Sequence, residues 1–171
     1  MRKFVLALAL TLAAAIPASA QQINMNFPEL EDRAEEVVDI TLDASMLRMA
    51  SKFFSGRDAD ERAIRDMING LHGIYVRSYE FAKEGEYDRG LVDRIKSQLG
   101  PSWKPLVTVR SKKKENVNIY ANMVGERVTG IVIIAAEPKE FTVVNINGPI
   151  DIERLSQLEG QFGIPELSKE K

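Results

Sequence analysis

The sequence of 171 residues contains no cysteine and only one histidine, His72. Without cysteine the chain forms no disulfide, has no thiol chemistry and cannot carry a lipid-modified cysteine anchor. Structural zinc and copper sites are built mainly from cysteine and histidine, so one histidine argues against both metals. We therefore expect no metal centre, no cofactor and no disulfide.

The chain also lacks an excess of positive charge, because 23 basic residues stand against 25 acidic ones and the formal net charge is −2. Nucleic-acid-binding proteins present a basic surface to phosphates, so this balance argues against a nucleic-acid partner. The one basic run, Lys112 to Lys114, is followed at once by Glu115 and Asn116. We interpret it as the exposed turn of a hairpin, with a membrane-surface patch as the alternative.

Long apolar runs are absent except near the N-terminus. Residues 4–16 form a run of about 13 mostly apolar residues, whereas a membrane-spanning helix needs roughly 20. Two basic residues precede this run, and a proline and the small-residue pattern of residues 18–20 follow it, in the order of a secretory signal. We expect a signal peptide over residues 1–20, cleavage between Ala20 and Gln21, and a soluble protein in the periplasm or outside the cell. A retained membrane anchor is the alternative.

The remaining chain is long enough for one domain with its own core. Residues 21–36 are polar and acidic, with Phe27 and Leu30 as apolar docking points. Residues 37–165 form the predicted single domain, and residues 166–171 are a polar tail.

Residue periodicity predicts the elements of this domain. The predicted helices begin at Asp43, Asp58, Leu91 and Asp151. The predicted strands are residues 38–42, 74–81, 106–110, 117–124, 128–136 and 141–146. Short connections make the last four strands antiparallel neighbours, so they form a C-terminal meander, and the doubly apolar residues 128–136 form a central strand. We predict an α+β fold with a mainly antiparallel sheet and helices on one face.

Candidate catalytic residues are isolated in the sequence. His72 has no partner for acid–base catalysis and follows a predicted helix, where we interpret it as facing the helix dipole. Asp58 and Glu61 are interpreted as a helix capping box rather than as a cation site. Glu80 and Glu137 lie at strand ends, and a catalytic carboxylate pair would need a proximity that the sequence does not define. We predict no catalytic residue and no metal ligand.

Five asparagines fall on or beside the predicted strands: Asn116, Asn118, Asn122, Asn145 and Asn147. Asn118, Tyr120 and Asn122 share one strand face, opposite an apolar face. One interpretation is a solvent face. The other is a binding surface in which Tyr120 is an anchor and the amides form hydrogen bonds, so these three are the candidate binding residues. Aromatic residues that would extend this surface are Tyr75, Tyr79, Phe81 and Trp103.

Two apolar features are expected in the core. Trp103 is the first, and its alternative is a place on the binding surface. The second is a stripe at helical spacing, between Met46 and Phe54. A dimer face is the alternative for this stripe. Its members are Met46, Leu47, Met49, Ala50, Phe53 and Phe54.

Three segments together resemble a known family. They are Val38 to Leu42 (VDITL), Gly73 to Phe81 (GIYVRSYEF) and Ala135 to Asp151 (AAEPKEFTVVNINGPID). Over residues 28–165 the chain resembles the exported bacterial proteins catalogued as domain of unknown function 4252. The resemblance implies export and a shared fold, but no activity and no functional residue. Members of that family often carry a lipobox cysteine, which this chain lacks, so the resemblance implies export without a tether.

These observations favour a non-catalytic binding or interaction module of the bacterial cell envelope, with an envelope protein as its expected partner. Two alternatives stay open. One is a small-ligand carrier with an apolar cavity between helices and sheet. The other is a hydrolase with an acid-only site made of aspartate and glutamate.

Overall fold

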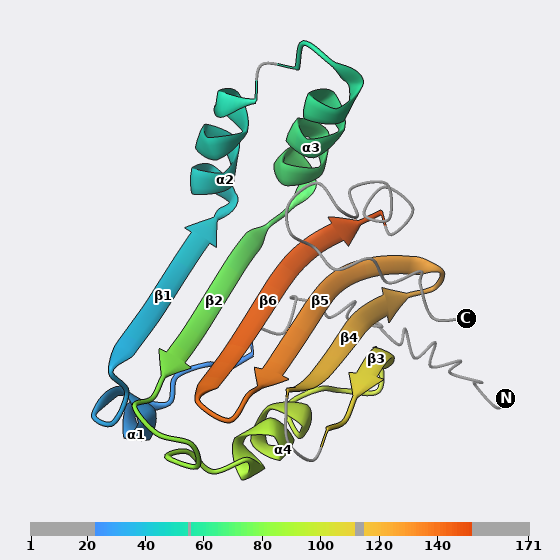
Figure 1. Cartoon of the computed structure of the whole chain (residues 1–171). Helices are drawn as coiled ribbons and strands as arrows, with labels where there is room; N and C mark the ends of the chain where they lie inside the picture. The colour runs from blue at the N-terminus through green and yellow to red at the C-terminus, as the bar shows by residue number, and fades with distance from the viewer. Residues whose placement is uncertain (1–22, 55, 112–114, 152–171) are drawn as a thin grey trace, which may run out of the picture.

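The computed structural model describes residues 23–54, 56–111 and 115–151, arranged as Figure 1 shows. The helices are α1 (Pro28–Glu31), α2 (Ala44–Ala50), the short 3₁₀ helix η1 (Ser51–Phe53), α3 (Ala59–Gly70) and α4 (Gly90–Lys96). The strands are β1 (Glu36–Asp43), β2 (Gly73–Glu80), β3 (Trp103–Val109), β4 (Asn116–Val124), β5 (Arg127–Ala136) and β6 (Glu140–Ile150). The predicted signal peptide, its cleavage site at Ala20 and Gln21, the lysine run, the helix after Asp151 and the polar tail lie outside the described residues.

The strands form one antiparallel sheet in the order β1-β2-β6-β5-β4-β3. The last four strands are neighbours in chain order, which confirms the predicted meander. Strand β5 lies between β6 and β4, so the doubly apolar segment is internal as predicted. The meander joins the N-terminal half where β6 pairs with β2 (Figure 1). The α+β prediction is confirmed.

Strand β6 is longer than the sequence indicated. We expected the last strand to end at residue 146, but this was wrong, because Ile150 still pairs with Val128 after a register shift. Gly148 has a φ of 128°, and a Cβ there would lie 2.8 Å from the Leu71 Cα. Glycine therefore lets the strand pass close to the end of α3 and continue.

The first core lies on the sheet face that carries Tyr79 and Phe141. The N-terminal segment, α1 and α4 cover this face, and Phe27 makes edge-on ring contacts with Tyr79 (6.3 Å between centroids) and Phe141 (5.7 Å). Leu30 is buried in the same core. The predicted docking of Phe27 and Leu30 is confirmed. Helix α4 contributes Leu91 and Ile95.

The second core lies on the opposite face, toward the end of the sheet where β1 and β2 meet the helical hairpin. The expectation that the helices lie on one face was therefore wrong, because α1 and α4 cover the other face. Leu47 of α2 and Leu71 after α3 pack there with Ala121 and Ile131 of the meander. Figure 1 shows α2 and α3 extending beyond the ends of β1 and β2. The hairpin therefore lengthens the molecule and does not lie across the middle of the sheet.

Aspartates cap both helices of this hairpin. The Asp43 carboxylate accepts hydrogen bonds from the backbone N–H groups of Ser45 (2.8 Å) and Met46 (2.9 Å), and Asp58 accepts one from Glu61 (2.7 Å). The reciprocal half of the predicted capping box was wrong by one residue. The Glu61 carboxylate accepts from the N–H of Arg57, at 3.3 Å, rather than from that of Asp58.

Candidate functional site

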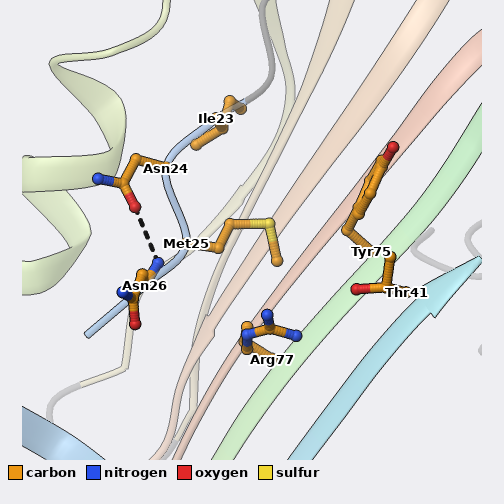
Figure 2. Close-up of a pocket in the computed structure, with 7 residues that line it drawn as sticks. All are labelled: Ile23, Asn24, Met25, Asn26, Thr41, Tyr75 and Arg77. Carbon is orange, nitrogen blue, oxygen red and sulfur yellow. Dashed lines mark hydrogen bonds between the residues drawn. The ribbon is translucent and has the colours of Figure 1, made fainter. Parts of the chain in front are cut away.

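A pocket of about 360 Å³ lies between the N-terminal segment and the edge of the sheet (Figure 2). Thr41 of β1 and Tyr75 and Arg77 of β2 form one wall, since Thr41 and Tyr75 are cross-strand partners. The segment from Ile23 to Asn26 forms the other wall. This pocket therefore belongs to the same sheet face as the first core, beside β1.

Arg77 places a positive charge in the wall of this pocket. Its guanidinium pairs with Asp39, the cross-strand neighbour on β1, and its side chain is 24% exposed against 56% for Asp39. Arginine donors with the hydroxyl groups of Thr41 and Tyr75 can bind a polar ligand or a polar side chain. Figure 2 shows the Met25 side chain reaching over Arg77 from the opposite wall.

Hydrogen bonds to Gln98, which follows α4, hold the N-terminal wall. The backbone of Asn24 donates to the side-chain oxygen of Gln98 at 2.8 Å and accepts from its amide nitrogen at 3.1 Å. The Asn24 side chain accepts from the backbone of Asn26 at 3.0 Å, as Figure 2 shows. Because Ile23 and Met25 are buried between these polar residues, the segment is fixed against the sheet.

The three predicted binding residues do share one face of β4, but the structure places them in different surroundings. Asn118 is 5% exposed, so its interpretation as a solvent-facing residue was wrong. Tyr120 is half-buried against the first core, and the side-chain oxygen of Asn122 is buried without a hydrogen-bond partner among the described residues. This face is covered because the N-terminal segment and α4 pack on it. The three residues therefore do not form one open surface.

Asn118 lines a separate pocket of about 270 Å³ between α4 and the meander. Three basic residues share its lining, namely Arg89, Lys96 and Arg110. Sequence reasoning missed this grouping, because the sequence does not show that α4 packs beside the end of β3.

The aromatic residues proposed to extend the surface around Tyr120 also lie in different surroundings. Tyr75 lines the pocket of Figure 2, whereas Tyr79 and Phe81 are buried in the first core. Trp103 is buried too, which confirms its expected packing. A Cβ at Gly130 would lie 3.2 Å from the Ile146 carbonyl oxygen and 3.4 Å from the Trp103 ring, so the backbone of β6 is its tighter neighbour.

Asn145 is a polar residue whose burial the sequence did not indicate. It is fully buried next to its cross-strand partners Tyr75 and Val132, and neither side-chain polar atom has a hydrogen-bond partner among the described residues. A buried amide without a partner is destabilising. The alternation of β6 placed Asn145 on one face, but only the pairing of β6 with β2 and β5 shows that this face is covered.

The carboxylates at the opposite end of the sheet bear on the acid-only alternative. Glu80 is the cross-strand partner of Glu140, whose carboxylate accepts hydrogen bonds from the hydroxyl groups of Ser78 (2.7 Å) and Thr142 (2.8 Å). Burial raises the pKa of the Glu137 carboxyl, and the charges of Glu115 and Glu140 raise it further. These groups lie in and beside the β5–β6 turn. None of them lines the pocket of Figure 2.

Tyr87 fixes the same turn. Its hydroxyl donates to the backbone carbonyls of Glu137 and Glu140, the latter at 3.2 Å, and burial raises the pKa of Tyr87 to about 12. The ring stacks on Phe81 at 5.3 Å between centroids. We interpret the site as a structural clamp, because both hydrogen bonds of the hydroxyl to described residues go to backbone carbonyls.

The remaining candidates for chemistry, His72 and Asp58, lie at helix ends. His72 is exposed after α3, and its backbone N–H donates to the Asn147 carbonyl at 2.8 Å. Asp58 is a helix cap, as predicted. Within residues 23–54, 56–111 and 115–151, no group of three or more histidine, aspartate or glutamate side chains is arranged to hold a metal ion.

The predicted apolar stripe of the first hairpin helix is only partly buried. Leu47 is 2% exposed, but Met46 is 42%, Met49 is 59% and Phe53 is 87% exposed. The core prediction was therefore wrong for Met46, Met49 and Phe53, which we call the α2 stripe. The hairpin projects past the sheet, so the sheet covers only the side that carries Leu47.

The fold and these surfaces define a small α+β protein. Residues 31–158 match the family described as Domain of unknown function (DUF4252), and the chain belongs to that family. Comparison with curated proteins and with solved structures gave no match. Among the helices of the described residues, none has the length and apolar character needed to cross a membrane.

Proposed function

We propose that this protein is a non-catalytic interaction module of the bacterial cell envelope, which binds another envelope protein through the α2 stripe. The observation that carries the proposal is the exposure of Phe53, at 87%, beside Met49 and Met46 on one side of the hairpin. Phenylalanine and methionine are enriched at the centres of protein interfaces. Each such side chain contributes about 1.5–3 kcal/mol when it is fully removed from water.

The spacing of the stripe supports one continuous contact surface. Met46, Met49 and Phe53 are three and four residues apart, so they lie along one side of α2 and η1. The hairpin that carries them extends beyond the sheet (Figure 1). A partner can therefore reach the stripe without contact with the rest of the fold.

Export belongs to the same proposal. The N-terminal sequence has the three parts of a secretory signal, with cleavage proposed between Ala20 and Gln21. The first buried residue of the described structure is Ile23, which follows that position. Cleavage there would therefore keep the whole described core in the mature protein.

The test compares tagged wild-type protein with a Met49→Ser/Phe53→Ser variant after chemical crosslinking in cells. We expect a defined envelope protein to co-purify with the wild type and to be lost from the variant. Val124→Ser is the matched control, because Val124 is an exposed apolar residue (47%) at the other side of the sheet. N-terminal sequencing of the purified protein should begin at Gln21. Recovery of the same proteins from all three would overturn the role of the stripe.

A small-ligand carrier is the second candidate, and the pocket of Figure 2 favours it. The pocket offers a cation, two hydroxyl groups and apolar surface from Ile23 and Met25 within about 360 Å³. A thermal-shift screen of small polar compounds tests this role. Arg77→Met should abolish any stabilisation that a ligand of this pocket produces.

A further inference from the structure

One edge of the sheet is open to pairing. Among the described residues, strand β1 is hydrogen-bonded to β2 alone, because it is the outermost strand in the sheet order. Six of its eight residues are exposed, including the large apolar residues Val37 (41%) and Ile40 (40%). An outermost strand presents a row of unpaired backbone N–H and C=O groups, which another extended chain can pair with.

The opposite edge carries features that discourage such pairing. Strand β3 contains Lys104 and Pro105, and its register shifts between Pro105 and Val107. Lysine, proline and bulges on outermost strands are common protections against association through the edge. Strand β1 contains neither lysine nor proline, and its register with β2 is unbroken from Glu36 to Asp43. The two edges therefore differ in what they permit.

We propose that β1 binds an extended, basic segment of a partner protein, which adds to the sheet as a further strand. Such strand addition uses main-chain hydrogen bonds for affinity and side-chain pockets for specificity. This inference rests on the proposed interaction function and names the chemistry of the partner. It uses a surface next to the α2 stripe, since α2 follows β1 directly in the chain.

The charge of the edge identifies the partner as basic. Residues 35–43 contain Glu35, Glu36, Asp39 and Asp43 and no basic residue. The Asp43 carboxylate caps α2 and Asp39 pairs with Arg77, which leaves Glu35 and Glu36 as the exposed charges nearest the start of the strand. Lysine or arginine side chains on an added strand would lie opposite these carboxylates.

The same charges disfavour a second copy of this chain as the occupant. Antiparallel pairing of two β1 strands about their centre would place Glu36 of each copy opposite Asp43 of the other. Parallel pairing would place each acidic residue close to its own equivalent. Like charges directly opposite one another destabilise a strand pair. A basic segment of a different protein avoids this repulsion.

The pocket of Figure 2 supplies a site for one side chain of the added strand. Thr41 lines the pocket from β1 itself, on the face that also carries Tyr75 and Arg77. Side chains of directly opposite residues in a sheet have Cβ atoms about 4.5–5.5 Å apart. A residue paired with Thr41 from outside would therefore project over the same face, next to the pocket.

The test measures binding of a fluorescent eight-residue peptide that alternates lysine and valine to the mature protein, by fluorescence anisotropy. We expect saturable binding, and about tenfold weaker binding by a Glu35→Lys/Glu36→Lys variant, since two exposed charges are reversed. Lysine at position 36 faces Glu80 across the strand pair, which favours the folded state. Glu126→Lys in the exposed β4–β5 turn is the matched control and should bind as the wild type does.

Backbone methylation separates strand addition from simple charge attraction. In an added strand the amide groups of alternate residues face β1 and the others face solvent. Two peptides, N-methylated at the odd or at the even residues, should therefore differ, with one bound and the other not. Equal binding of both isomers and the unmodified peptide, or binding of a glutamate–valine peptide as tight as that of the lysine peptide, would overturn the inference.

The two tests together distinguish failure of strand addition from failure of the proposed function. Peptide binding by strand addition, together with unchanged partner recovery in the Met49→Ser/Phe53→Ser variant, would keep the β1 site and overturn the α2 stripe. Loss of the partner in that variant without peptide binding would overturn strand addition and keep the interaction module.

Discussion

At the scale of single residues, the structure separates polar groups that stabilise the fold from polar groups that do not. The Tyr87 hydroxyl holds two carbonyls of the β5–β6 turn, whereas the amide of Asn145 is buried without a partner among the described residues. Both are polar residues in apolar surroundings, so composition alone does not distinguish them. The difference lies in which backbone groups the fold brings within reach.

Glu137 should make stability depend on pH in a defined direction. Burial raises the pKa of its carboxyl above the ordinary value of 4.5. The folded state therefore holds the proton to higher pH than the unfolded state does, and stability falls as pH rises through the interval between the two pKa values. Glu137→Gln removes this titration.

Urea unfolding of the wild type and of Glu137→Gln at several pH values measures this effect. We expect the variant to gain stability relative to the wild type as pH rises from below 4.5, where the two differ least. A difference that is constant with pH would show that Glu137 titrates alike in both states.

At the scale of elements, periodicity in the sequence placed every described strand and the helices α2, α3 and α4, because these patterns depend on local neighbours. It could not say which face of a strand is covered. Strand β4 has Asn118 and Tyr120 on one face and Ile119 on the other, and the N-terminal segment and α4, far away in sequence, cover the face with Asn118. Asn118, Tyr120 and Asn122 were therefore correctly predicted to share one strand face, but the sequence did not indicate that this face is covered.

The helical hairpin shows the same limit. Apolar spacing between Met46 and Phe54 defined the helix, but the stripe was expected in the core. Only the direction of the chain after β1, which carries α2 past the end of the sheet, determines that Met49 and Phe53 are exposed. Residue spacing shows which side chains share one face of a helix, but it does not show whether another element covers that face.

The hairpin should depend on the cap that starts it. Hydrogen bonds from Ser45 and Met46 lower the pKa of Asp43, so the ionised carboxylate stabilises the folded state and that contribution is lost as pH falls. We expect Asp43→Ala to reduce the free energy of unfolding at neutral pH, because it removes the oxygen that accepts hydrogen bonds from Ser45 and Met46. Asp43→Ser, which keeps a capping oxygen, should cost less, as chemical denaturation would show. Equal losses in both variants would mean that the cap does not stabilise α2.

At the scale of the whole molecule, most of the large exposed apolar side chains lie in the outermost strand β1 and in the hairpin after it. The N-terminal segment, α1 and α4 close one face of the meander, while β1 and the hairpin after it carry five large exposed apolar residues: Val37, Ile40, Met46, Met49 and Phe53. Large exposed apolar patches on soluble proteins commonly mark interaction sites. The proposed partner contacts therefore gather on one continuous stretch of chain, residues 36–53.

A site-specific crosslink in cells tests the interaction role of the α2 stripe most directly. A photoreactive amino acid replaces Phe53 in one protein and Val124 in another, and both are produced from the full-length sequence and irradiated in the same way. The interaction module predicts a discrete crosslinked product with another envelope protein from position 53 and none from position 124. Crosslinks from position 124 alone, or identical products from both positions, would contradict the assignment of the α2 stripe as the binding surface.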